Sequence, residues 1–235
     1  MPDTDARTAC IIPAYDEEET VAGIASLAAS HPLVRSVTVV DDGSVDATSD
    51  RAASVEGVRV VRLDENRGKG AAMHAGLEAT DEPIVLFLDA DLIGLTHDHI
   101  SDLLAPVLSG QADMAVGVFR GGRLHTDLAH ILTPSLSGQR AIRRSVLANL
   151  DMDSVRFGIE RALTELWETG SIKVKMVVLR AVTHRTKEEK RGWIAGVMQR
   201  LCMFWDIARY EKNRLGRRIR GDSGSRNRRE GDQNP

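Results

Sequence analysis

Short apolar runs that alternate with helical patterns limit the fold of this 235-residue chain more than any other feature. Three helical patterns, at residues 17–29, about 45–54 and 69–79, separate four apolar runs at residues 9–12, 36–40, 58–63 and 83–88. Strands that are apolar throughout and alternate with helices are typical of a parallel sheet with helices on both faces. We therefore predict a Rossmann-like α/β fold with a mostly parallel sheet.

The second half of the chain has a less regular pattern. We predict helices at about 98–108, 128–132, 157–169 and 188–217, strands at 113–118 and 171–182, and loops at 121–122 and 134–139. The expected organisation is one domain at 1–192, an amphipathic helix at 193–219 and a disordered basic tail at 220–235.

The formal net charge of -3 hides an asymmetry between the body and the C-terminal end. Residues 209–235 contain nine Lys or Arg and four Asp or Glu, a net of +5. Residues 1–208 therefore contain 22 basic and 30 acidic residues, a net of -8. This acidic body argues against a nucleic-acid partner.

The two cysteines, Cys10 and Cys202, both lie in apolar segments, which excludes a disulfide framework. Residues 1–8 lack the apolar core of a signal peptide, and no run of about 18 apolar residues occurs. We expect a cytoplasmic protein without a membrane-spanning helix.

Polar clusters lie where the predicted strands end and where the third helix begins. They are Pro-Ala-Tyr-Asp-Glu-Glu at 13–18, Asp-Asp-Gly-Ser at 41–44, Asn-Arg-Gly-Lys-Gly at 66–70 and Asp-Ala-Asp-Leu at 89–92. Ligands of open α/β sheets bind beyond the carboxyl ends of the strands, so these clusters are expected to share one rim.

Asp89 and Asp91 follow a buried strand, and such a carboxylate pair suits Mg²⁺ or Mn²⁺ that also takes oxygens from a substrate diphosphate. The alternative is a pair of turn or helix-capping aspartates. His184 follows the late strand and could complete the metal shell, which would favour Mn²⁺. Its alternative is a structural or exposed histidine.

Lys69 lies between two glycines at a helix start, where an ammonium group and free backbone N–H groups can bind phosphate. The alternative is a flexible loop with a solvated lysine. Glu160, at a later helix start, is either a cap, an acceptor-binding group or a general base.

The order of these motifs resembles that of family 2 nucleotide-sugar glycosyltransferases with the GT-A fold, over about residues 8–192. The resemblance implies that the nucleotide base and ribose contact Pro13, Ala14, Tyr15, Glu17 and Asp42. It implies that Lys69 contacts the diphosphate, and that Asp89 and Ala90 lie beside the ribose or donor sugar. It also implies that Asp91 and His184 bind the metal. Lys69 and Asp91 would then act in catalysis, with Glu160 as the base for a hydroxyl acceptor.

Later motifs are similar to those of glucosyl-3-phosphoglycerate synthases, and the first half is also similar to polyprenyl-phosphate sugar transferases. The first similarity implies a phosphorylated acceptor that contacts Gly121, Gly122, Arg123, Thr126 and Glu160. The second implies a lipid phosphate acceptor. The apolar face at 194–207 either packs on its own domain or on a dimer mate, or lies on a membrane surface.

The sequence thus predicts a metal-dependent glycosyltransferase that uses a UDP- or GDP-sugar and a small phosphorylated acceptor such as 3-phosphoglycerate. The alternatives are a polyprenyl-phosphate sugar transferase, a nucleotidyltransferase and a non-catalytic sugar-nucleotide-binding protein. A nucleotidyltransferase needs a basic glycine-rich loop after the first strand, where this chain is acidic. Asp89, Asp91 and Lys69 argue against a non-catalytic protein.

Overall fold

The computed structural model describes residues 8–120, 138–147, 163, 166 and 169–185. The helices are α1 (Val21–Ala29), α2 (Thr48–Ala53), α3 (Lys69–Glu78), α4 (His97–Leu108) and α6 (Arg144–Leu147). The strands are β1 (Thr8–Ala14), β2 (Val34–Asp41), β3 (Val58–Arg62), β4 (Ile84–Phe87), β5 (Leu92–Ile93), β6 (Met114–Arg120), β7 (Arg140–Arg143), β8 (Val174–Arg180) and β9 (Thr183–His184).

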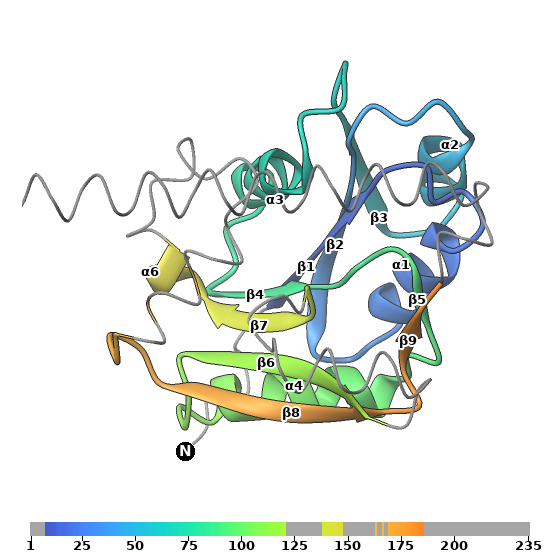
Figure 1. Ribbon diagram of the computed structural model, residues 1–235. Helices are drawn as coiled ribbons and strands as arrows, with labels where there is room; N and C mark the ends of the chain where they lie inside the picture. The colour runs from blue at the N-terminus through green and yellow to red at the C-terminus, as the bar shows by residue number, and fades with distance from the viewer. Residues whose placement is uncertain (1–7, 121–137, 148–162, 164–165, 167–168, 186–235) are drawn as a thin grey trace, which may run out of the picture. The chain divides into compact units, whose positions relative to one another are not determined.

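Seven of these strands form one mixed sheet in the order β3-β2-β1-β4-β7-β6-β8 (Figure 1). β7 pairs antiparallel with both β4 and β6, while the other neighbouring strands pair in parallel. Six strands therefore run one way and β7 runs the other way. The predicted α/β fold with a mostly parallel sheet is confirmed.

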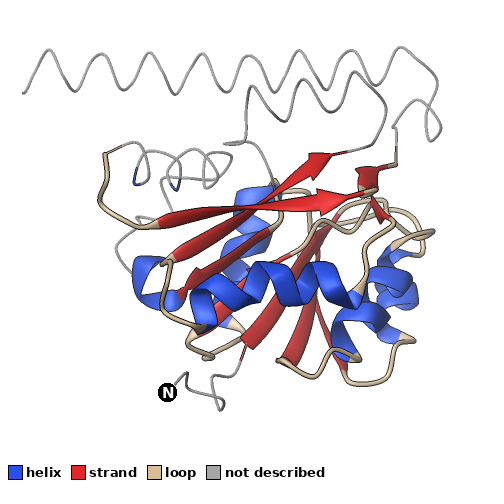
Figure 2. Ribbon diagram, turned by 90° about the horizontal axis from the view of Figure 1, so that it is seen from below, coloured by secondary structure: helices blue, strands red, loops and turns tan. Residues whose placement is uncertain are grey.

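Helices cover both faces of the sheet, because successive strand residues point to opposite sides. Cys10 and Ile12 of β1 belong to a buried cluster with residues of α1, α2 and α4. Ile11, between them, belongs to a second cluster with residues of α3 and α6. Figure 2 shows the strands rotating progressively across the sheet between these helices.

The strand order reverses between β1 and β4, and the carboxyl ends of these two strands lie at this switch point. β2 follows β1 on one side, whereas β4 lies on the other side of β1. In open α/β sheets such a switch point forms the ligand-binding crevice. The polar clusters predicted to share a rim follow β1, β2 and β4, which end at this edge.

β7 is absent from the sequence-based prediction, which has a loop up to residue 139 and no strand between that loop and the strand at 171–182. Its sequence, Arg-Ala-Ile-Arg, is short and carries too little alternation to indicate a strand. β1 also extends through Pro13, at which we expected it to end. The pairing of β1 with β4 stops at Ile11, so the missing N–H of Pro13 leaves no bond to that neighbour unmade.

A two-stranded sheet of β5 and β9 is a second unpredicted feature. It pairs Leu92 with His184 and Ile93 with Thr183 in antiparallel register. Gly94 follows β5 with a φ of +81°, and a Cβ there would collide with the carbonyl oxygen of Ala181. Glycine is thus required where the two segments approach, and the sheet brings the end of the described chain back to Asp91.

By contacts the chain divides into two compact units, Met1–Arg185 and Thr186–Pro235, and all described residues belong to the first. The predicted boundary at residue 192, the helix at 193–219 and the tail at 220–235 lie outside the described residues, as do the helix near 128–132 and most of that at 157–169. No described helix has the length and apolar character needed to cross a membrane.

Candidate active site

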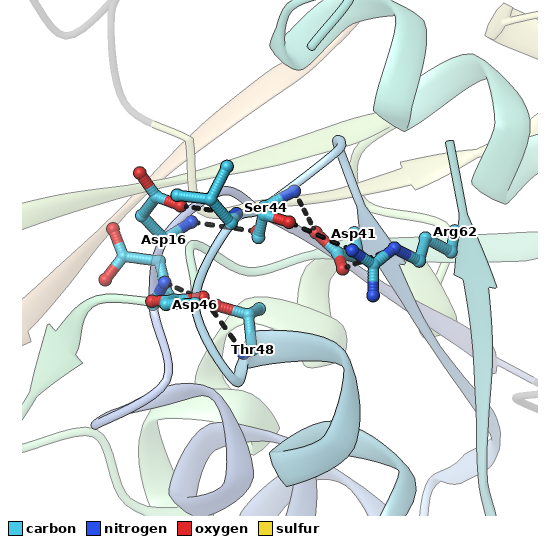
Figure 3. Close-up of polar contacts among 8 residues, drawn as sticks. Asp16, Asp41, Ser44, Asp46, Thr48 and Arg62 are labelled. Carbon is cyan, nitrogen blue, oxygen red and sulfur yellow. Dashed lines mark hydrogen bonds and ion pairs between the residues drawn. The ribbon is translucent and has the colours of Figure 1, made fainter. Parts of the chain in front are cut away.

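The loops after β1 and β2 are bonded to each other at the carboxyl edge of the sheet (Figure 3). The backbone N–H of Asp16 donates to Ser44 Oγ at 2.9 Å, and the N–H of Val45 donates to Asp16 Oδ1 at 3.1 Å. The N–H of Glu17 donates to Thr48 Oγ1 at 2.7 Å. We call residues 16–20 and 44–48 the double loop, since these bonds hold the two segments together.

Asp41 fixes the base of the double loop from the end of β2. Its Oδ1 accepts the N–H of Ser44 at 2.9 Å, and its Oδ2 lies 3.7 Å from Arg62 Nε. Arg62 Nη2 also donates to the carbonyl oxygen of Ser44 at 3.0 Å. The carboxylate of Asp41 is fully buried. Buried polar groups are normally hydrogen-bonded, and these contacts connect the double loop to the ends of β2 and β3.

Asp42 links the end of β2 to the start of α3. Its two carboxylate oxygens accept the backbone N–H groups of Arg67 and Gly68, each at 2.8 Å. Burial raises the pKa of Asp42, and the two N–H bonds offset only part of that rise. Asp42 thereby fixes the loop that leads into α3, whose first residue is Lys69. The contact of Asp42 with the nucleotide base stays a prediction.

Lys69 and Gln139 hold the carboxylate of Asp89 from two sides. Lys69 Nζ lies 2.7 Å from Asp89 Oδ1, and Gln139 Nε2 donates to Asp89 Oδ2 at 2.7 Å. Burial alone would raise the pKa of Asp89, but the positive charge of Lys69, the proximity of His184 and the hydrogen bonds lower it below its ordinary value. Asp89 is therefore a carboxylate throughout the neutral pH range.

Asp91 and His184 meet because β9 pairs with β5. His184 Nδ1 lies 2.9 Å from Asp91 Oδ1, and the N–H of Arg185 donates to the carbonyl oxygen of Asp91 at 2.9 Å. His184 Nε2 is 3.9 Å from Asp89 Oδ2. Burial alone would lower the pKa of His184, but the hydrogen bond to Asp91 and the two carboxylate charges raise it.

The donor atoms of this cluster suit a divalent cation. Asp89, Asp91 and His184 each offer one ligand atom, and these atoms lie within 4.8 Å of one another. Within the described ranges this is the one group of three such residues. Two carboxylate oxygens and one imidazole nitrogen are ligands that fit Mg²⁺ and, because of the imidazole, Mn²⁺.

The structure brings together four of the predicted site residues: Lys69, Asp89, Asp91 and His184. The donor-side residues Pro13, Ala14, Tyr15 and Glu17 lie at the end of β1 and in the segment after it, and Ala90 lies between the two aspartates. The predicted acceptor residues Gly121, Gly122, Arg123, Thr126 and Glu160 lie outside the described residues.

Gln139 is a site residue that sequence reasoning did not single out. It follows Gly138 in a predicted loop, and neither residue carries a charge or a periodic pattern. The sequence holds no signal that identifies it, because the strand that follows is too short to predict and only its antiparallel direction brings residue 139 to the carboxyl edge of the parallel strands.

The chain belongs to glycosyl transferase family 2, whose family model matches residues 9–163. Among curated proteins it is similar to glucosyl-3-phosphoglycerate synthase of Mycobacterium tuberculosis, with 30% identity over 191 residues, 65% of this chain and 58% of the relative. It is also similar to dodecaprenyl-phosphate galacturonate synthase of Rhizobium johnstonii, with 30% identity over 116 residues, 46% of this chain and 34% of the relative. The chain thus spans less than two thirds of the length of these proteins.

Solved structures show the same fold. The crystal structure of glucosyl-3-phosphoglycerate synthase from Mycobacterium tuberculosis with Mn²⁺ and UDP-glucose matches with a TM-score of 0.65 and 26% identity, covering 86% of this chain and 78% of that chain. The complex that also contains phosphoglyceric acid matches with a TM-score of 0.62 and 27% identity, covering 77% and 72%. The predicted resemblance to this family and to the GT-A fold is confirmed.

Proposed function

We propose that this protein transfers a sugar from a nucleoside diphosphate donor, UDP- or GDP-linked, to a small phosphorylated acceptor such as 3-phosphoglycerate. The single observation that carries the proposal is the cluster of Asp89, Asp91 and His184 beside Lys69 at the switch point of the sheet. The similarity to a synthase solved with Mn²⁺ and UDP-glucose supports it.

The residues of the cluster have separate tasks in this proposal. Asp91 and His184 would hold a divalent cation, which when bound neutralises negative charge on the leaving diphosphate. Asp89, expected beside the ribose or donor sugar, lies close enough to them to be a third ligand. Lys69 would turn from Asp89 to the diphosphate and stabilise the charge that develops there, as a preorganised cation does. Asp42 would keep Lys69 in reach by holding the backbone of Arg67 and Gly68.

The donor side of the proposal includes Pro13, Ala14, Tyr15 and Glu17 around the base and ribose. The double loop keeps this segment in place, because the N–H groups of Asp16 and Glu17 are bonded to Ser44 and Thr48. The acceptor side, with Gly121 to Arg123, Thr126 and Glu160, rests on the resemblance to glucosyl-3-phosphoglycerate synthases.

A lipid phosphate is the second candidate acceptor. It is favoured by the match of 116 residues to dodecaprenyl-phosphate galacturonate synthase. The two candidates share a phosphate group and differ in whether the acceptor is dissolved or held in a membrane. A dimer contact or a membrane contact of residues 193–219 stays a prediction.

A thermal-shift screen of UDP- and GDP-linked sugars, with and without Mn²⁺ or Mg²⁺, tests the donor. A ligand that binds only the folded state raises the melting temperature in proportion to the logarithm of its concentration over its Kd. We expect a shift that needs both nucleotide and metal. Absence of any metal-dependent shift with either base would contradict the proposal.

The acceptor is tested with the donor that gives the largest shift. Release of the nucleoside diphosphate is measured with 3-phosphoglycerate in solution and, separately, with polyprenyl phosphate in vesicles. Stimulation by 3-phosphoglycerate alone supports the small acceptor. Stimulation by the vesicles alone supports the lipid phosphate and overturns the first choice.

A further inference from the structure

Three residues lie directly against the carboxylate of Asp89: Lys69, Gln139 and Gly138. Asp89 Oδ1 lies 2.7 Å from Lys69 Nζ, and Asp89 Oδ2 accepts a hydrogen bond from Gln139 Nε2 at 2.7 Å. Gln139 is completely buried, and the side chain of Asp89 is 15% exposed. A buried amide donor at this distance from a charged acceptor forms a strong hydrogen bond that fixes the acceptor's orientation.

Gly138 closes the third side of the same carboxylate. A Cβ built on Gly138 would overlap both carboxylate oxygens of Asp89. The backbone of Gly138 is not in the left-handed region, so space alone requires a glycine here. The carboxylate therefore lies directly against the chain of residues 138–139, and any larger side chain at 138 must displace it.

The backbone of Gln139 is held in place by the sheet on both sides. The N–H of Gly117 in β6 donates to the carbonyl oxygen of Gln139 at 2.9 Å. The next residue, Arg140, pairs with Phe87 of β4 and with Val116 of β6. Because β7 runs opposite to its neighbours, its amino end lies beside the carboxyl end of β4, where Asp89 follows.

We propose that Gln139 is a positioning residue, which with Gly138 fixes the Asp89 carboxylate for binding of the metal and the donor. The inference rests on the proposed function and deepens it. The positive charge of Lys69 draws it to the diphosphate, whereas Gln139 is a neutral, fully buried amide that we expect to keep its bond to Oδ2. Gln139 thus prevents Asp89 from rotating when its ion pair with Lys69 is broken.

Two substitutions at Gln139 separate hydrogen bonding from packing. Gln139→Met keeps the length of the side chain and removes the donor, while Gln139→Glu keeps the shape and places a second carboxylate against Asp89. The first measurement is the Kd of UDP or GDP, whichever binds the unsubstituted protein more tightly, by calorimetry at saturating Mn²⁺. We expect about a 10-fold loss for Gln139→Met and a larger one for Gln139→Glu.

The second measurement is the Mn²⁺ concentration that gives half-maximal nucleotide binding, compared with the melting temperature of the ligand-free variants. A positioning role shifts the Mn²⁺ midpoint upward in Gln139→Met. A packing role lowers the melting temperature and leaves both the Mn²⁺ midpoint and the Kd unchanged, which would overturn the inference.

Substitution of glycines gives an independent test with a matched control. Gly138→Ala is expected to displace Asp89 and raise the Mn²⁺ midpoint at least as much as Gln139→Met. Gly23→Ala is the control, because Gly23 lies in α1 with nothing within 4 Å of an added Cβ. Equal Mn²⁺ midpoints in the two alanine variants would overturn the inference.

Failure of the proposed function has a different signature. An unsubstituted protein that binds neither UDP nor GDP in the presence of Mn²⁺ contradicts metal-dependent sugar transfer, and the positioning role falls with it. An unsubstituted protein that binds one of them, with Gln139→Met unchanged, contradicts the positioning role alone.

Discussion

The two halves of the candidate active site are constructed in different ways. In the first half, the double loop and Asp42 are bonded mainly through backbone N–H groups of neighbouring loops. In the second half, Gln139 and His184 reach the aspartates through single side chains. The first half is thus a preformed frame, and the second half supplies individual groups whose placement depends on β7 and β9.

The difference indicates how such a site can change during evolution. The first half is expected to tolerate few amino-acid substitutions, because each of its side chains accepts a backbone N–H group and so holds a loop in place. Single groups at the ends of a short strand can be exchanged without rebuilding the frame. We therefore expect substitutions in the first half to affect folding, and those in the second half to affect metal and donor binding.

The largest effect is expected for Asp91→Ala, which removes a direct ligand of the predicted metal site. Loss of residues that only orient metal ligands costs about 10- to 100-fold in affinity, so loss of a ligand is expected to cost more. Calorimetry with the nucleotide and Mn²⁺ should detect no metal-dependent binding. Undiminished affinity in this variant would remove Asp91 from the site.

Asp42→Ala tests whether the first half is a structural frame. Two hydrogen bonds that backbone N–H groups donate to the charged carboxylate would be lost, which is expected to lower the free energy of unfolding by about 3 kcal/mol. Urea denaturation measures this change. Asp50→Ala, at an exposed position of α2, is the control and should change stability by less than about 0.5 kcal/mol. Equal stability of both variants would contradict the frame.

Glu19→Gln tests how firmly the second half is attached. Glu19 forms an ion pair with Arg185, which follows β9 and His184, and the Glu19 side chain is 60% exposed. Exposed ion pairs contribute about 0–1 kcal/mol, so the Mn²⁺ midpoint is expected to rise less than about fivefold. A rise as large as that of Gln139→Met would show that β9 depends on this pair.

His31 provides the smallest test, outside the site. Its Nδ1 accepts the N–H of Leu33 at 3.2 Å, and its Nε2 lies 3.0 Å from Ser101 Oγ. Burial and the nearby His97 lower the pKa of His31. The folded state therefore binds fewer protons than the unfolded state, and stability present above the unfolded pKa is lost as pH falls toward the folded pKa.

His31→Asn removes this titration while keeping an acceptor near Leu33. The melting temperature of the variant is expected to fall less between pH 7.5 and pH 5.5 than that of the unsubstituted protein. Gly23→Ala, in α1, adds no titratable group, so it is the control and should retain the original slope. An unchanged slope in His31→Asn would contradict the assignment.

The sequence predicts the positions of Lys69 and of the two aspartates well, because these residues adjoin strongly patterned elements. Asp89 and Asp91 follow a buried apolar strand, and Lys69 starts a helix at the residue predicted. His184 could be proposed because it follows a recognisable late strand. In each case the position along an element determines the position in space.

The remaining features depend on pairing between distant segments, which no local pattern records. The partners of Asp42 are backbone N–H groups 25 and 26 residues further on. Gln139 precedes a four-residue strand with an arginine at each end, and it acts on a residue 50 positions earlier. Neither contact has a characteristic spacing or composition.

The pairing of β5 with β9 has a consequence for synthesis of the protein on the ribosome. The double loop and its anchor Arg62 lie within the first 62 residues, whereas Asp91 meets a histidine that is added 93 residues after it. During synthesis a domain generally folds as a unit, once its segments have emerged. The candidate metal cluster is therefore complete only after residue 184 has been added, so the proposed metal affinity is gained late in synthesis.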